Sequence, residues 1–288
     1  MSRCYLSVSG IGLRIDSDEV LAAEGSCEPF LTEPAEPDVC AEFRCVDRLP
    51  FEPIEEIWQD IVWRICRVKS GETVRFFYED RKSMVPYACA SWDEERRNIY
   101  IAYLSRERSR FRSVMNCFFY IGLEQILVRH ERIWPHASCV ETEFGGILFS
   151  GVSGIGKSTQ AGLWCRYRDA RQINGDRPIL SGGEQGWLAW GAPYAGSSRC
   201  YVNESCPVRA IVILRQAKDC SLRRLNPMGA FREVWKVLVH QSWDREYLER
   251  LSNLAMDLIT RVPVYLFECT PNEQAVRCLE EELRKEAM

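Results

Sequence analysis

The segment from Gly151 to Ser158 is the feature that most constrains what this chain can fold into. It reads GVSGIGKS and matches the pattern G-x-x-x-x-G-K-[ST] at every fixed position. The apolar run GGILFSG before it predicts a strand, and the residues from about Lys157 to Tyr167 predict a helix. A strand, a glycine-rich turn and a helix in this order turn successive backbone N–H groups toward phosphate oxygens. The sequence therefore predicts a phosphate-binding P-loop, with a purely structural glycine turn as the alternative.

The positions of the motif have separate chemical tasks. Its glycines let the backbone curl, and the helix that follows adds its positive N-terminal end. Lys157 can reach the β- and γ-phosphates, and the Ser158 hydroxyl can ligate magnesium. These tasks predict ATP and Mg²⁺ as cofactors, and GTP stays open because backbone groups do not read the base. The expected nucleotide-binding residues are Gly151, Ser153, Gly154, Ile155, Gly156, Lys157, Ser158 and Thr159.

A carboxylate that could complete the magnesium site follows the motif. Asp176 stands in QINGDRPIL, where a short apolar segment delivers it between Gly175 and Pro178. We expect Asp176, with Ser158, to hold the metal directly or through water, or to accept the proton of an attacking hydroxyl. The alternative is an ordinary turn residue at a strand end.

Pattern divides the chain into two regions. Residues 1–108 contain short runs of β-branched and aromatic residues separated by turn formers, which predict a β-rich region that could grip a substrate. In residues 109–288, buried strands such as RAIVILRQ and VPVYLFECT alternate with helical patterns, which predicts an α/β core.

Helical spacing and capping signals predict further elements. Apolar residues from Ile54 to Ile65 recur at helical spacing, and residues 111–128 read as one mostly buried helix. The segment TPNE, from Thr270 to Glu273, predicts a capping box with proline at the first helical position of the last helix.

Composition excludes several functional classes. With 37 Lys and Arg against 41 Asp and Glu, the net charge of −4 offers no basic excess to hold nucleic acid. The fourteen cysteines include no Cys-x-x-Cys pair, so neither a zinc ribbon nor a redox dithiol is expected. No apolar stretch approaches the ~20 residues that span a membrane, and no N-terminal leader is visible. We therefore expect a cytoplasmic protein with reduced thiols.

Beyond the motif, the chain resembles the superfamily of HPr kinases and phosphoenolpyruvate carboxykinases, and within it a group of HPr-kinase-like proteins. The resemblance rests on HASCVETEFGGILFSGVSGIGKSTQAGLW, INGDRPIL and GAPYAGSSRCYVNESCPVRAIVILRQA. It implies an α/β fold with a P-loop kinase core of this type. It also implies a phosphate-facing or acceptor-facing role for His136, which precedes Lys157 by about the interval found in HPr kinases. On its own, a histidine after Trp134 and Pro135 is more often a packing or capping residue.

Two departures from the family limit what the resemblance implies. HPr kinases show adjacent aspartates after the P-loop helix, whereas Gly175 precedes Asp176 here. A single carboxylate must then serve as metal ligand or base. The C-terminal signature of true HPr kinases and the metal and substrate set of carboxykinases are also not evident, so HPr and oxaloacetate are not the expected substrates.

The segment GAPYAGSSR, from Gly191 to Arg199, reads as a second anion-binding loop. Arg199 would offset charge that develops on the γ-phosphate, and Glu204 would organise metal-bound water. The alternative is a surface turn.

These observations predict an ATP- and Mg-dependent kinase that transfers the γ-phosphoryl group to a hydroxyl. The expected catalytic residues are His136, Lys157, Asp176 and Arg199. A serine of a peptide or small protein is the first candidate acceptor, and a small molecule such as an amino acid or sugar is the second. A non-catalytic ATP-sensing accessory protein is the alternative from another class, and a homo-oligomer stays open. Neither nucleic acid nor a membrane is an expected partner.

Overall fold

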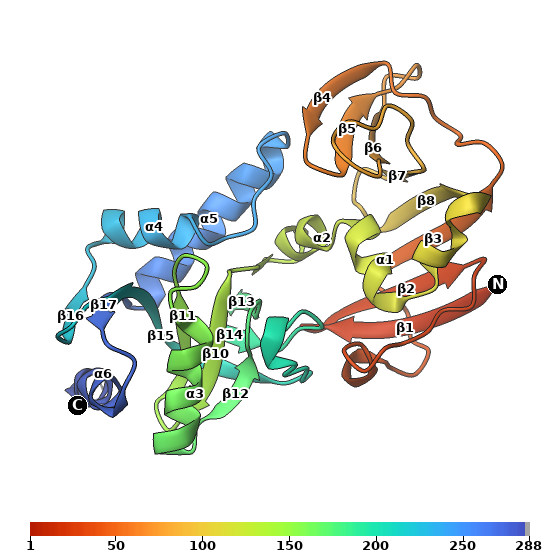
Figure 1. Ribbon diagram of the computed structural model, residues 1–288. Coiled ribbons are helices and arrows are strands. Elements are labelled where there is room, and N and C mark those ends of the chain that lie inside the picture. The colour runs from red at the N-terminus through yellow and green to blue at the C-terminus, as the bar shows by residue number, and fades with distance from the viewer. Residues whose placement is uncertain (286–288) are drawn as a thin grey trace. The chain divides into compact units, whose positions relative to one another are not determined.

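A computed structural model describes residues 1–285, which form two compact units (Figure 1). The first unit comprises residues 1–126 with residues 242–244, and the second comprises residues 127–241 with the chain from residue 245 onward. All fourteen cysteines carry free thiols. Among the described residues, none of the helices combines the length and the apolar character that crossing a bilayer requires.

The first unit is built on one eight-stranded sheet in the order β1-β2-β3-β8-β7-β6-β5-β4. Neighbouring strands are antiparallel except for the parallel pairs β2–β3 and β3–β8. The strands are β1 (Ser2–Val8), β2 (Ile11–Ser17), β3 (Val39–Val46), β4 (Glu55–Gln59), β5 (Trp63–Arg67), β6 (Thr73–Phe77), β7 (Ala88–Trp92) and β8 (Asn98–Leu104). The helical segments are η1 (Glu28–Phe30), η2 (Ser105–Phe111), α1 (Val114–Ile121) and α2 (Leu123–Arg129), the last of which continues into the second unit.

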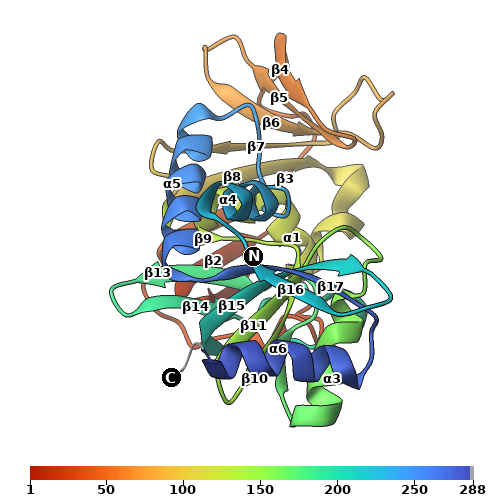
Figure 2. The same cartoon turned by 90° about the vertical axis from the view of Figure 1, so that its left-hand side faces the viewer.

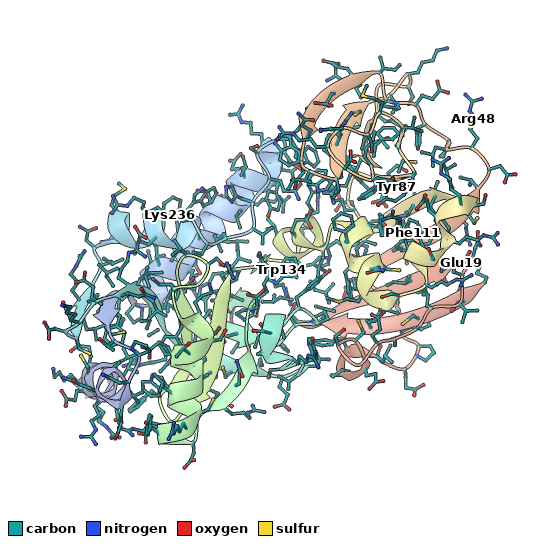
Figure 3. All side chains as sticks on the ribbon, viewed as in Figure 1. Glu19, Arg48, Tyr87, Phe111, Trp134 and Lys236 are labelled. Carbon is teal, nitrogen blue, oxygen red and sulfur yellow. The ribbon has the colours of Figure 1, made fainter. Side chains whose placement is uncertain are left out.

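Aromatic side chains hold the helical segments of the first unit on its sheet. Phe111, at the end of η2, stacks on Tyr103 of β8 with ring centroids 3.9 Å apart, and Tyr120 of α1 lies 4.4 Å from Phe111. All three side chains are buried. Such rings bury large apolar areas and add about 0.5–1.5 kcal/mol per pair beyond that burial. The strands predicted in this region are confirmed, and Figure 3 labels Phe111 within this core.

The helix predicted between Ile54 and Ile65 is wrong. The segment forms β4 and β5, which pair antiparallel with an irregularity between Glu56 and Trp58. Ile54 and Ile61 are each 66% exposed, whereas Ile65 is fully buried. Helical spacing was present, but β-branched and aromatic residues favour strands, and pairing of β5 with β6 provides the context that decides.

The single helix predicted over residues 111–128 is divided into three parts. Phe111 ends η2, and α1 begins after Ser113, whose hydroxyl accepts the backbone N–H of Asn116 at 3.2 Å. Gly122 closes α1 in the left-handed conformation at φ 68°, and α2 follows directly. Glycine adopts this backbone without a Cβ penalty, so the apolar pattern continues across a break in the helix.

The second unit contains a branched nine-stranded sheet with the main order β12-β10-β11-β15-β14-β13-β9, to which β17 adds beside β15 and β16 beside β17. The strands are β9 (Arg132–Ile133), β10 (Ala137–Thr142), β11 (Gly145–Ser150), β12 (Arg171–Asn174), β13 (Ile179–Gly183), β14 (Gly186–Trp190), β15 (Ser205–Gln216), β16 (Ser221–Arg224) and β17 (Val264–Cys269). The helices are α3 (Lys157–Arg168), α4 (Pro227–Trp235), α5 (Arg245–Arg261) and α6 (Glu273–Lys285), with the short η3 (Gly196–Ser198).

Helices cover both faces of the central strands of this second sheet (Figure 2). Ile147 and Phe149 of β11 belong to an apolar cluster with residues of α3 and α6. Leu148, between them, belongs to a second cluster with residues of α4 and α5. This alternation is the period of two that a strand buried on both faces requires. Removing a buried ring such as that of Phe149 would cost about 3–5 kcal/mol. The predicted α/β character is confirmed.

The capping box predicted at the start of the last helix is wrong in its details. Helix α6 begins at Glu273, and the Asn272 side chain accepts the backbone N–H of Ala275 at 3.1 Å. The Thr270 hydroxyl instead donates to the Ala217 carbonyl oxygen at 2.7 Å. Asn caps a helix N-terminus at least as well as Thr does. The Thr270 side chain is instead engaged by the backbone of Ala217, just after β15.

The parallel pair β11–β15 aligns the two elements that matter most for the site. Ser150, the last residue of β11, lies opposite Ile213 of β15. Gly151 therefore leaves the sheet where β11 ends, while β15 continues to Gln216 and carries Arg215 past that point at the same carboxyl edge. In α/β sheets this edge is where ligands bind.

Candidate functional site

The glycine-rich segment forms the predicted connection from β11 to α3. Gly151, Gly154 and Gly156 all have left-handed backbones, with φ of 141°, 78° and 109°. Gly156 occupies the N-cap of α3, where no side chain caps the helix. The N–H groups of the first turn are thus free of a side-chain cap and can donate hydrogen bonds to an anion. The residues exposed to solvent beside them are Ser153, Gly154, Ser158 and Thr159.

Lys157 is turned into the loop rather than outward. Its side chain is only 7% exposed, and its Nζ lies 3.4 Å from the carbonyl oxygens of both Gly151 and Val152. Burial lowers the pKa of Lys157; the Asp176 carboxylate opposes this effect and the Arg177 guanidinium adds to it. Both hydrogen bonds are long, so a phosphate oxygen that entered the loop would offer the ammonium a better partner.

His136 and Asp176 form a second cluster. The His136 Nε2 lies 3.0 Å from the Asp176 Oδ1. His136 stands just before β10 and Asp176 just after β12, and the backbone N–H of Ala137 donates to the Asp176 carbonyl oxygen at 2.9 Å. The sequence-predicted residues His136 and Asp176 are therefore brought together by two adjacent strands.

The imidazole of His136 is biased toward its neutral form. Burial lowers its pKa, and the Lys157 ammonium lowers it further, while the Asp176 carboxylate acts in the opposite direction. The influence of Lys157 connects the glycine-rich loop electrostatically with the His136–Asp176 pair. A neutral imidazole paired with a carboxylate can act as a general base.

Asn174 orients Asp176 and was not identified from the sequence. It is fully buried, and its Oδ1 accepts the backbone N–H groups of Asp176 at 2.9 Å and Arg177 at 2.7 Å. Its Nδ2 donates to the carbonyl oxygen of Tyr194 at 2.9 Å. The signal was the Asn-Gly-Asp run, because Asn side chains bond to backbone groups two residues later in turns.

The space beside Asp176 is filled by the turn that contains η3. A Cβ atom on Gly175 would lie 2.0 Å from the Ser198 Oγ, and one on Gly196 would lie 2.9 Å from the Asp176 Cβ. The Ser198 hydroxyl donates to the Ala195 carbonyl oxygen at 2.6 Å. This packing leaves no room at position 175 for a second carboxylate unless the turn moves.

Arg199 and Glu204, both assigned to the site by sequence, have different surroundings. Arg199 is exposed, has a left-handed φ of 52° and makes no hydrogen bond or ion pair within residues 1–285. Glu204 is ion-paired with Arg171. The structure thus supplies no contact between these two side chains and Lys157, His136 or Asp176.

A cavity of about 570 Å³ opens beside the loop within the second unit. His136 and the loop residues 151–153 line it, together with cationic side chains from other elements. Its lining residues are His136, Gly151, Val152, Ser153, Arg177, Ile213, Arg215, Glu233, Lys236, Val237, Leu238, Val239 and His240. A smaller cavity of about 160 Å³ lies against residues 154–156 and Thr159.

Glu233 of α4 ties two of these cations together. Its carboxylate lies 3.0 Å from Arg215 Nη2 and 2.8 Å from Lys236 Nζ. Burial alone would raise the pKa of Glu233, but the hydrogen bond and charge of Lys236, together with Arg215, outweigh it and lower the pKa. Lys236 follows the last turn of α4 (Figure 3). Sequence reasoning missed this trio, although Arg215 lies near the end of the apolar run RAIVILRQ.

The donor set near the loop fits a magnesium ion that arrives with a triphosphate. Within residues 1–285, no group of three or more His, Cys, Asp or Glu side chains is arranged to hold a metal ion. Magnesium commonly needs only one or two protein ligands when phosphates supply others. Ser158 is exposed at the start of α3 and Asp176 is partly exposed, so both could serve.

Comparison with known proteins adds a distant likeness. No family model matches the chain, and no curated protein matches its sequence. Among solved structures, the Hpr(Ser) kinase/phosphatase from Coxiella burnetii resembles it with a TM-score of 0.32 and 15% sequence identity, over 54% of this chain and 97% of that one. The structural relationship is distant.

Proposed function

We propose that the second unit binds a nucleoside triphosphate with magnesium and transfers the γ-phosphoryl group to a hydroxyl. The observation that carries the proposal is the loop from Gly151 to Gly156, which ends in an uncapped helix and encloses the Lys157 ammonium. Converging N–H groups and a desolvated cation at one point are suited to a triphosphate.

Each residue has a role in the proposed reaction. The loop amides and Lys157 hold the phosphates, and Ser158 with Asp176 would hold magnesium, which neutralises charge on the triphosphate. The acceptor oxygen bonds to the γ-phosphorus while the bond from that phosphorus to the bridging oxygen breaks, and the electron pair leaves with the nucleoside diphosphate. The hydroxyl proton passes to the His136–Asp176 pair. Such catalysis relies mainly on positioning and electrostatics.

A serine of a peptide or small protein is the first proposed acceptor, and an amino acid or sugar is the second. A non-catalytic ATP sensor is supported by one observation, the packing of Gly175 against Ser198, which leaves a single carboxylate next to the loop. A kinase would release ADP steadily when extract of the source cell supplies the acceptor, and a sensor would not.

Calorimetry with Mg-ATP and Mg-GTP tests the binding step. We expect saturable binding by the unchanged chain and at least a tenfold weaker affinity for Lys157→Ala, because a charge-assisted hydrogen bond to phosphate is lost. Lys218→Ala, which removes an exposed ammonium of the same unit, is the matched control and should bind as the unchanged chain does. Absence of heat with both nucleotides would overturn the proposal.

A further inference from the structure

We infer that the 570 Å³ cavity is the acceptor subsite and that the acceptor carries an anionic group, a carboxylate or a phosphate, close to the hydroxyl it presents. This inference rests on the proposed function, which it deepens by naming the chemical class of the acceptor. The observation behind it is that Arg177, Arg215 and Lys236 line the same cavity as His136.

The two cavities beside the loop divide the nucleotide from the acceptor. The small cavity touches residues 154–156 and Thr159, and the large one touches residues 151–153; Arg215 lines both, whereas Lys236 and Arg177 line the large cavity. The Lys157 Nζ lies at the carbonyl oxygens of Gly151 and Val152, which is the end of the loop that faces the large cavity. Since this lysine reaches the β- and γ-phosphates, the transferred group is expected at that end.

His136 provides a second reason to place the acceptor there. Its side chain lines the large cavity, and its Nε2 contacts the Asp176 Oδ1 at 3.0 Å. The groups that would take the hydroxyl proton therefore border the same space. A volume of about 570 Å³ is typical of sites for small molecules, and it would equally hold the end of a peptide.

The charge of the cavity wall exceeds what its own ion pairs need. Three cations, Arg177, Arg215 and Lys236, stand against two carboxylates, Glu233 and Asp176, the second of which lies 3.9 Å from Arg177. This leaves an excess of one positive charge if the histidines are neutral. Glu233 contacts both Arg215 and Lys236, and its side chain is only 11% exposed. It therefore acts as a positioning residue that holds two donors at the rim of a cavity. Guanidinium and ammonium groups held in this way are the usual partners of carboxylates and phosphates.

The test measures binding of inorganic phosphate to protein that is saturated with magnesium and a non-hydrolysable β,γ-imido analogue of ATP. The loop is then occupied, so phosphate can report only on the remaining space. The imidazole NMR signals of His136 and His240, which both line the cavity, give the readout. We expect saturable shifts, and at least tenfold weaker phosphate binding for Arg215→Gln and for Lys236→Gln. Affinity of Lys236→Gln for the analogue should change less than twofold, because Lys236 lines only the large cavity of the two.

Matched controls and a second probe define the chemistry. Arg223→Gln and Lys218→Gln remove exposed charges of the same unit outside the cavity and should leave phosphate binding unchanged. Glycerate should bind where neutral glyceramide does not, and the stronger of glycerate and phosphate identifies the preferred group.

Three outcomes would overturn the inference, and they distinguish its failure from the failure of the proposed function. If the analogue binds but phosphate and glycerate cause no saturable shift, the acceptor subsite is not anionic and the proposed nucleotide site stands. If Lys236→Gln weakens binding of the analogue as much as binding of phosphate, the cations of the large cavity hold the triphosphate instead. If the analogue itself fails to bind, the proposed function fails first.

Discussion

Gly175 and Ser198 pack so closely that a single methyl group on the glycine would lie 2.0 Å from the serine Oγ and 2.3 Å from its Cβ. This contact joins the end of β12 to the turn around η3. It holds the backbone immediately before Asp176, so the position of the carboxylate depends on a residue that has no side chain.

Gly175→Ala is expected to destabilise the protein by about 1–3 kcal/mol, because the added methyl group overpacks a site with no free space. Ser198→Gly should restore part of the loss in the double variant, although the Ala195 carbonyl oxygen at 3.0 Å still limits the fit. Gly25→Ala, with no atom within 4 Å of the new methyl group, is the control. Urea unfolding measures all four proteins, and equal stability of Gly175→Ala and Gly25→Ala would contradict the packing.

The pKa of His136 should respond in opposite directions to changes at its two charged neighbours. Asp176→Asn removes a group that raises the pKa and should lower it, whereas Lys157→Met removes a cation that lowers it and should raise it. NMR titration of a chain with three histidines, assigned through His136→Gln, measures both shifts. Shifts of the same sign in the two variants would contradict the described electrostatics.

The lowered pKa of His136 also predicts how stability depends on pH. The folded state binds its proton less readily than the unfolded state, in which the pKa is near the ordinary value of 6.5. As the pH falls below 6.5, the unfolded state gains protons first, and the free energy of unfolding decreases until the pH passes the folded pKa. His136→Gln should remove this part of the decrease. Denaturation curves between pH 5 and 7.5 provide the comparison, and an identical slope in both proteins would count against it.

Asn174→Leu is expected to cost about 1–3 kcal/mol, because the buried backbone N–H groups of Asp176 and Arg177 lose their acceptor. The turn that presents Asp176 should become less ordered as well. Under the proposed function, the shift of the His136 imidazole NMR signals on nucleotide binding should therefore be smaller. Asn253→Leu, on the exposed side of α5, is the matched control for the loss of an amide. The unfolding midpoint in urea reports the cost, and a midpoint shared with the control would argue against this role.

Substitutions at two isoleucines distinguish the strand pair β4–β5 from the helix that the sequence suggested. Ile65→Lys should cost about 3 kcal/mol or more, since it buries a charge in a fully enclosed position. Ile54→Lys should change stability by less than about 0.5 kcal/mol, because Ile54 is 66% exposed. On one helix these residues would share a buried face and behave alike, so comparable losses in thermal unfolding would favour the helix.

Local signals in the sequence were sufficient for the strand, loop and helix around Lys157. There the glycines, the apolar run before them and the helical pattern after them all predict the same strand, loop and helix, and the motif is contiguous in the sequence. Residues 54–65 failed because a helical period coincided with β-branched residues, and only pairing with β6 decides between the two. For the same reason, one helix was predicted where Gly122 divides α1 from α2.

The sequence named only some of the residues that the structure brings together beside the glycine-rich loop, because the others are far apart along the chain. Asp176 could be named because it follows a short apolar segment downstream of the glycine-rich motif, and His136 because of the family resemblance; the structure brings the two to 3.0 Å. No local sequence pattern predicts the contact among Arg215 near the end of β15, Glu233 of α4 and Lys236 just after it. Arg199 was chosen for its type and place in a turn, and its exposed position makes no such contact.

The alignment of β15 with β11 has a consequence for how recognition could be lost. Ile213 sits opposite Ser150, and this match decides that the guanidinium of Arg215 emerges level with the glycine turn. A slip of one residue would displace it by about 3.3 Å and send it to the opposite side of the sheet. Under the proposed function, the placement of a ligand's charged group would therefore depend partly on the pairing of interior apolar residues such as Ile213, although these residues carry no charge themselves.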